Sequence, residues 1–131
     1  MPGIPCVYYG SEWGAAGRKE DGDPALRVSF DAPVENELSA WIAKLAAAKK
    51  SSKALQYGDF SSVVLTNGQC IFKREWEGER VLVAINAADS PFWAGFNLGT
   101  NQAVDLITGE GVEFHDGCEL PAYSAFFWKL K

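Results

Sequence analysis

Residues 60–76, FSSVVLTNGQCIFKREW, decide the fold class of this 131-residue chain. Their first part, Phe60–Thr66, is rich in β-branched residues and is followed by Asn67-Gly68, the dipeptide most typical of a tight β-hairpin. The returning part, residues 69–76, places Cys70, Phe72 and Trp76 on one face and Gln69, Lys73 and Glu75 away from it. Two such runs joined by an Asn-Gly turn predict a pair of antiparallel strands.

Further short β-rich runs continue from this hairpin to the end of the chain. Glu77-Gly78 turns the chain again, and the next strand alternates from Val81 to Asn86. Four more runs, separated by turns that contain glycine, lie at residues 92–98, 103–107, 112–115 and 123–130. About seven short strands with turn signals between them are typical of two packed antiparallel sheets. We therefore predict an antiparallel β-sandwich over residues 58–131.

The first 57 residues have a different character. They open with MPGIPCVYYG, whose apolar run at residues 4–9 is typical of a strand buried on both faces. A long loop rich in glycine and charge follows, and the spacing of apolar residues predicts a helix over about residues 36–50, with Asn36 as its N-cap. One strand, one loop and one helix are too small to bury themselves, and they are what remains of a β/α barrel cut after its seventh unit. Residues 1–57 are therefore predicted to be a barrel remnant that precedes the sandwich.

Composition restricts the partners and cofactors of the chain. Lys and Arg number 12 against 17 Asp and Glu, and this negative balance argues against nucleic acid, because phosphate binding needs a clustered positive field. No apolar stretch approaches the roughly 20 residues of a membrane span, which argues against a membrane partner. Three dispersed cysteines, Cys6, Cys70 and Cys118, and the single His115 have no metal-ligand spacing. We therefore expect reduced thiols in a cytoplasmic protein, without a metal or another cofactor.

Several short motifs follow one another along the chain: MPGIPCVYYGSEWG at residues 1–14, DPALR at 23–27, KALQYGDF at 53–60, VAIN at 83–86, DLITGE at 105–110 and LPAYS at 120–124. Together, and in this order, they resemble the alpha-amylase family of glycoside hydrolases, with the neopullulanase and cyclomaltodextrinase-like members as the nearest relatives. In that family the first two motifs belong to the eighth barrel strand and its loop, and the third to the junction with the C-terminal domain. The resemblance implies the C-terminal portion of an α-glucan-acting hydrolase of carbohydrate metabolism.

The resemblance also implies where the catalytic groups of such an enzyme lie. Retaining hydrolysis needs a carboxylate nucleophile and a carboxylic acid about 5 Å apart, and the family carries these, and a third carboxylate, on earlier barrel segments. None of the three maps onto this chain, so we expect no catalytic residue here and no cleavage by this chain alone. In some relatives the positions of Asp23 and Arg27 hydrogen-bond a sugar a few subsites from the cleaved bond. The structural alternative for Asp23 and Arg27 is an ion pair that stabilises the loop.

A second function, of a different class, is a freestanding carbohydrate-binding module. The chain has five Trp and eight Phe, and exposed aromatic rings stack on sugar faces in such modules. Large aromatics at alternate strand positions of a small sandwich mostly lie in the core, and among Trp76, Trp93 and Trp128 we expect Trp93 to be the exposed one. The expected partner of an intact parent enzyme is an α-glucan. The strand at residues 4–9 lacks its neighbours, so we expect it to be disordered, to repack on the sandwich, or to pair with a second copy of the chain.

Overall fold

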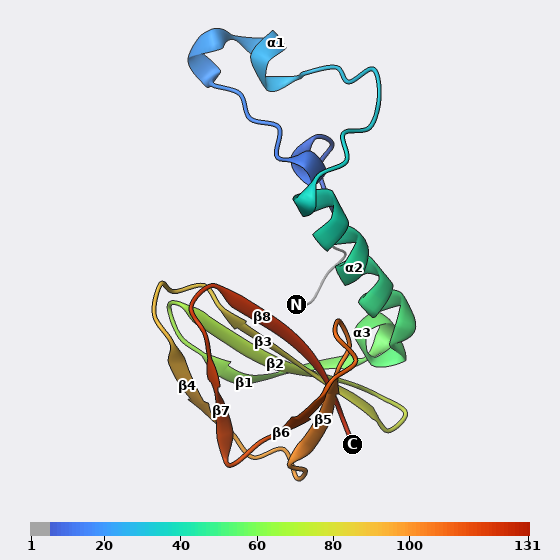
Figure 1. The fold of residues 1–131 in the computed structure, drawn as a ribbon, viewed down its shortest axis with the longest axis vertical. Helices are drawn as coiled ribbons and strands as arrows, with labels where there is room; N and C mark the ends of the chain where they lie inside the picture. Colours follow the sequence, from blue (N-terminus) through green and yellow to red (C-terminus); the bar gives the residue numbers. More distant parts are fainter. Residues whose placement is uncertain (1–5) are drawn as a thin grey trace. The chain divides into compact units, whose positions relative to one another are not determined.

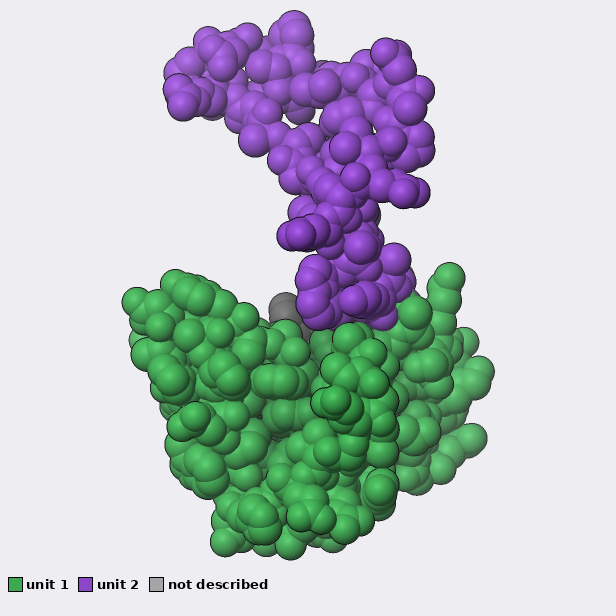
Figure 2. Space-filling view, in the orientation of Figure 1, with its two compact units in different colours: residues 1–2, 47–131 green, residues 3–46 purple. Residues whose placement is uncertain are grey.

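The computed structural model describes residues 6–131, and these form two compact units. Among the described residues one unit comprises residues 6–46 and the other residues 47–131 (Figure 2). The larger unit contains the strands of the described chain, and the smaller unit contains the loop-rich N-terminal segment. The predicted boundary at residue 57, between a barrel remnant and a sandwich, stays a prediction. None of the helices in residues 6–131 is long and apolar enough to cross a membrane.

The strands of the larger unit form two antiparallel sheets (Figure 1). Strand β4 (Phe92–Gly95) pairs with β7 (Gly117–Leu120) in the smaller sheet. The larger sheet has the order β1-β2-β3-β8-β5-β6, with the bounds Asp59–Leu65 for β1, Gln69–Trp76 for β2, Glu79–Asn86 for β3, Gln102–Asp105 for β5, Gly111–Glu113 for β6 and Ser124–Leu130 for β8. The predicted mainly-β, antiparallel fold is confirmed. Strand β7 was not predicted, because the sequence pattern indicates only a turn at this position.

The two hairpins at the start of the larger sheet use different turns. Glu77 and Gly78, between β2 and β3, both have positive φ (47° and 84°), as the tight type I′ turn requires. The Asn67-Gly68 loop also closes a hairpin, and the amide of Thr66 donates to the Gln69 carbonyl oxygen at 3.0 Å. Its residues do not have positive φ, and the Thr66 hydroxyl instead accepts the Gln69 amide at 2.9 Å. The predicted hairpin is therefore present, but a side chain supports its turn.

Replacing Gly78 with alanine is expected to lower the free energy of unfolding by about 1 kcal/mol, because an L-residue is disfavoured in the left-handed conformation. A Cβ at this position meets nothing within 4 Å, so the cost is conformational alone. Gly111→Ala is a matched control, because its Cβ also has open space and its φ is not positive. Urea denaturation of both variants measures the difference. Equal stability of the two variants would contradict the type I′ assignment.

Strand β3 is buried on both faces, because each face of the larger sheet is covered. On one face Leu82 lies in a cluster with Leu120 of β7. On the other face Val81 lies in a cluster with Leu55 of the short helix α3 (Lys53–Tyr57). The continuous apolar sequence of β3, in place of strict alternation, fits this double burial. The smaller sheet and α3 therefore enclose the strand from opposite sides.

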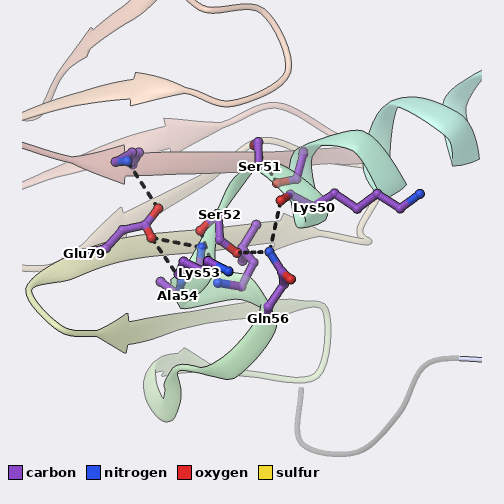
Figure 3. Close-up of polar contacts among 10 residues, drawn as sticks. Lys50, Ser51, Ser52, Lys53, Ala54, Gln56 and Glu79 are labelled. Carbon is purple, nitrogen blue, oxygen red and sulfur yellow. Dashed lines mark hydrogen bonds and ion pairs between the residues drawn. The ribbon is translucent and has the colours of Figure 1, made fainter.

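The first turn of α3 is held to the sheet by two capping side chains (Figure 3). Ser52, which is fully buried, accepts the Leu55 amide at 3.1 Å. Glu79 Oε2, from the start of β3, accepts the amides of Lys53 and Ala54 at 2.9 and 3.2 Å. These bonds satisfy amides that have no partner within the helix itself. A helix of five residues is thereby fixed at one position on the sheet.

Helix α2 (Glu37–Ser51) confirms the predicted helix at residues 36–50 and its N-cap. Asn36 Oδ1 accepts the Ser39 amide at 3.0 Å, and Ser39 Oγ accepts the Asn36 amide at 2.9 Å, which is a reciprocal cap. The Asn36 side chain also donates to the Trp13 carbonyl oxygen at 2.9 Å. The predicted long loop before this helix contains three single turns, η1 (Ser11–Trp13), η2 (Lys19–Asp21) and α1 (Asp23–Leu26).

The strand predicted at residues 4–9 is wrong over the part that the structure describes. Ile4 and Pro5 lie outside the described residues, and residues 6–9 form no strand. Tyr8 is 65% exposed, and Val7 and Tyr9 are exposed as well. A strand needs neighbouring strands for its amide and carbonyl groups, and residues 6–46 contain none. The homodimer predicted through this segment stays a prediction.

Candidate functional site

Asp23 and Arg27, the predicted sugar contacts, lie at the two ends of α1. Arg27 Nη2 is 3.7 Å from Asp23 Oδ2, and the side chains are 73% and 75% exposed, respectively. An ion pair this exposed adds little stability. Both groups therefore stay accessible, and a carboxylate that accepts beside a guanidinium that donates suits neighbouring hydroxyl groups of a sugar.

The loop that carries this pair is compact because Gly17 lacks a side chain. A Cβ on Gly17 would collide with the Ala25 carbonyl oxygen, so the close approach of these two segments requires glycine. A small apolar hollow adjoins α1, and its lining includes Tyr8, Leu26 and Phe30. Ala25 and Leu26, which lie between the two charged residues in sequence, line this hollow. Ligand sites commonly combine an apolar surface with a few polar groups.

Two polar atoms in η1 are buried and have no hydrogen-bond partner among residues 6–131, Glu12 Oε2 and Trp13 Nε1. Trp13 packs edge to face against Phe30, with ring centroids 5.2 Å apart. A buried polar atom without a partner costs about 1–3 kcal/mol. These atoms therefore point to hydrogen-bonding groups that the described residues do not supply.

Trp93 lies on the outer face of the β4–β7 sheet and is exposed, as expected. It is 59% exposed and pairs across the sheet with Glu119. The next position on this face holds Gly95 opposite Gly117, so no side chain rises beside the ring. One aromatic face is therefore open to solvent. Trp128, in contrast, is buried in the core, as predicted.

Trp76 was expected in the core, and this is wrong, because 40% of the residue is exposed. Its ring centroid lies 5.9 Å from that of Tyr57, with 53° between the ring planes. Tyr57 is 58% exposed. Trp76 is the last residue of β2 and Tyr57 is the last residue of α3, so the helix that covers this face ends at the same place. The alternation of apolar residues along β2 contains no signal for where that cover ends.

The carboxyl groups with shifted pKa values are both held ionised. The Lys73 ammonium, with Nζ 2.7 Å from Glu75 Oε2, lowers the pKa of Glu75. Burial by itself raises the pKa of Glu79, but hydrogen bonds from the Ala54 amide and the Ser52 hydroxyl contribute to a net lowering. A general acid in hydrolysis needs a raised pKa so that it keeps its proton. Neither glutamate therefore suits that role.

The cysteines are free thiols that differ in exposure. Cys6 is exposed, and Cys70 and Cys118 are half-buried. Burial raises the pKa of Cys118 to about 11, so its thiol stays protonated at neutral pH. Across residues 6–131 there is no group of three or more His, Cys, Asp or Glu that could hold a metal ion.

The chain has relatives among characterised proteins, although no family model matches it. It is 31% identical over 87 residues to a cyclomaltodextrinase of Thermoanaerobacter pseudethanolicus, a match that covers 64% of this chain and 15% of the relative. It is 34% identical over 91 residues to a cyclomaltodextrin glucanotransferase of Paenibacillus macerans, covering 67% of this chain and 12% of the relative. It is 26% identical over 118 residues to the alpha-amylase MalA of Haloarcula japonica, a match that covers 84% of this chain and 16% of the relative. The chain thus spans less than a fifth of these relatives.

Solved structures give the same result for the fold. An alpha-amylase from Anoxybacillus matches 98% of this chain with a TM-score of 0.85 and 27% identity, and this chain covers 29% of it. The alpha-amylase of Geobacillus thermoleovorans, solved with acarbose, matches 99% with a TM-score of 0.84 and 25% identity, and this chain covers 30% of it. Similarity in sequence and in fold leads to the same group of proteins. The chain is similar in sequence and in fold to a part of alpha-amylase family glycoside hydrolases.

Proposed function

We propose that this chain is the C-terminal, structural part of a glycoside hydrolase that acts on α-glucans. The parent is similar to the cyclomaltodextrinases, and its catalytic carboxyl groups lie outside this chain. The observation that carries the proposal is the match over 98% of the chain to an alpha-amylase of which it covers 29%. The similarity to a cyclomaltodextrinase supports the substrate class.

The surface of residues 6–46 supports the idea that further polypeptide covers this unit. Most of the exposed large hydrophobic residues of the described chain lie here, among them Tyr8 and Trp41, which are 65% and 53% exposed. Apolar exposure on this scale is typical of a face that packs against another protein surface. The unpartnered atoms of Glu12 and Trp13 lie in the same unit. A neighbouring part of a longer enzyme would cover the apolar residues and supply the missing hydrogen bonds.

The whole gene product is expected to release sugar from cyclodextrins and soluble starch, whereas the purified 131-residue chain releases none. Hydrolysis needs two carboxyl groups in defined roles, and the pKa values of Glu75 and Glu79 are lowered, which disfavours proton donation. A reducing-sugar assay on both proteins makes the comparison. Hydrolysis by the 131-residue chain, or a longer gene product without activity on any α-glucan, would contradict the proposal.

Within that enzyme, Asp23 and Arg27 are proposed to hold a sugar unit away from the cleaved bond. Asp23→Ala and Arg27→Ala in the whole gene product should raise KM for cyclodextrin several-fold and change kcat little, because the lost contacts bind substrate and transition state alike. Asp31→Ala, another exposed carboxylate of the same loop, is the matched control. An unchanged KM in both variants would contradict sugar binding by Asp23 and Arg27 and would show that their ion pair is only a contact within the loop.

The alternative function is a freestanding carbohydrate-binding module, and the open face of Trp93 favours it. The ring is 59% exposed and has glycines beside it on both strands of the smaller sheet. A module that binds through this ring should be retarded in a native gel that contains glycogen, and Trp93→Ala should abolish the retardation. Absence of retardation in every glucan tested would remove this alternative.

A further inference from the structure

Tyr57 and Trp76 form an exposed aromatic pair on the larger unit. The two residues are 58% and 40% exposed, and their ring centroids are 5.9 Å apart. The 53° between their planes means that the rings do not stack on each other, so neither ring covers a face of the other. A pair that served only the core would be covered by other side chains. This pair is instead presented to solvent.

Both rings are held in place by the elements that carry them. Gly58, directly after Tyr57, offers its carbonyl oxygen to Arg74 Nε and Nη2 at 2.9 and 2.6 Å. Arg74 precedes Trp76 by two positions and therefore lies on the same face of β2. A Cβ on Gly58 would lie 2.8 Å from the amide nitrogen of Glu75, so glycine lets the end of α3 press directly on β2. The guanidinium thus ties the two ring-bearing elements together.

Rings carried on a fixed backbone are suited to binding, because a ligand does not have to order the backbone first. The other end of α3 is capped by Ser52 and Glu79, and Trp76 is followed by the type I′ turn. Sites on rigid elements lose little conformational entropy when a ligand binds. The backbone positions of Tyr57 and Trp76 are therefore set before any ligand arrives.

Polar groups border the aromatic pair. Lys53 Nζ lies over the Tyr57 ring, 5.3 Å from its centroid, and the Tyr57 hydroxyl is a further donor and acceptor. Two rings bordered by an ammonium group form too small an apolar area for the core of a stable protein interface. A sugar chain matches better, because a pyranose ring has apolar C–H faces that stack on aromatic rings and hydroxyl groups that bind at the edges.

We propose that Tyr57 and Trp76 form an accessory binding surface for an α-glucan chain, separate from Asp23 and Arg27 and from Trp93. The choice of α-glucan rests on the proposed function. The surface would hold a polymeric substrate close to the enzyme without taking part in cleavage. Both residues lie in the larger unit, residues 47–131, so the surface needs no residue of the smaller unit.

Affinity electrophoresis of the 131-residue chain in native gels that contain glycogen tests this surface. We expect glycogen to retard the wild-type chain. Tyr57→Ala and Trp76→Ala should each bind glycogen roughly tenfold more weakly, because each removes one stacking ring. Trp76→Phe keeps an aromatic ring and should keep most of the retardation. Tyr123→Ala removes another exposed aromatic residue, 75% exposed, and should behave like the wild type.

Far-UV circular dichroism and thermal unfolding show whether each variant folds. If Trp76→Ala does not fold, Tyr57→Ala decides the outcome, because Tyr57 lies at an exposed helix end. A wild-type chain that glycogen does not retard, or full retardation of folded Tyr57→Ala, would overturn the proposal. The hydrolysis assay gives an independent answer. If the whole gene product hydrolyses α-glucans but glycogen does not retard the 131-residue chain, only the binding surface is contradicted. If the whole gene product is inactive but the 131-residue chain binds glycogen through Tyr57, only the proposed function is contradicted.

Discussion

Asn86→Ala is expected to lower the free energy of unfolding of the larger unit by about 3 kcal/mol, because it leaves several buried polar groups without a partner. The side chain is 1% exposed. Its Nδ2 donates to the carbonyl oxygens of Ser90, Leu120 and Pro121 at 2.9, 3.2 and 2.9 Å, and its Oδ1 accepts from Gln69 Nε2 and the Ala88 amide at 2.8 and 3.1 Å. One amide group therefore joins the end of β3 to the start of β2, the end of β7 and the loop after β3.

Asn86→Asp separates the loss of hydrogen bonds from the loss of volume. Aspartate has nearly the same shape, but it replaces the NH₂ donor with an oxygen that faces three carbonyl oxygens. At pH 7 the buried charge would have no donor on that side, which is costly. We therefore expect Asn86→Asp to be at least as destabilising as Asn86→Ala.

Urea denaturation at pH 7, followed by tryptophan fluorescence, measures these differences. Asn97→Ala is the matched control, because Asn97 is exposed and its side chain accepts a single bond, from the Gly99 amide at 3.0 Å. A change within about 1 kcal/mol is expected there. Wild-type stability in Asn86→Asp would show that the donor side of Asn86 contributes nothing.

Local sequence signals predicted the parts of the fold that depend on neighbours in the chain. The Asn67-Gly68 and Glu77-Gly78 dipeptides gave both hairpins, and Asn36 gave the start of α2. Strand β7 was missed because residues 117–120 pair with β4, far away in sequence, and contain no β-branched residue. Asn86 was identified only as the last residue of a strand, since its partners come from three other segments.

The candidate sites also differ in whether their residues are close together in the sequence. Asp23 and Arg27 are four positions apart, so helical geometry alone predicts that they meet. Tyr57 and Trp76 come from a helix and a strand, and only the packing of α3 against β2 places their rings together. Residues 6–9 have the composition of a strand but form none, because pairing is a property of neighbours and not of the segment itself.

Glu79→Gln is expected to lower the free energy of unfolding by about 2 kcal/mol at pH 7, since bonds to a charged acceptor are stronger than bonds to a neutral one. The carboxylate accepts the first amides of α3, those of Lys53 and Ala54, and its other oxygen lies 3.2 Å from Lys129 Nζ. The side chain is 17% exposed, so solvent screens these contacts only in part. Loss of the charge weakens the capping bonds and removes the ion pair, and α3 then holds less firmly to the sheet. Glu119→Gln, at an exposed position of β7, is the matched control and should be neutral.

The pH dependence of this effect has a definite sign. The pKa of Glu79 is lowered in the folded protein, because hydrogen bonds from the Ala54 amide and the Ser52 hydroxyl help to outweigh the opposing effect of burial. The folded state therefore binds its proton less readily than the unfolded state, whose glutamate has a pKa of about 4.3. The stabilisation is fully present above that pH and is lost as the pH falls through the folded pKa. Thermal unfolding from pH 7 to pH 3 should show the wild type approaching Glu79→Gln at the acid end. Parallel curves for the two proteins over this range would mean that the charge of Glu79 does not hold α3 on the sheet.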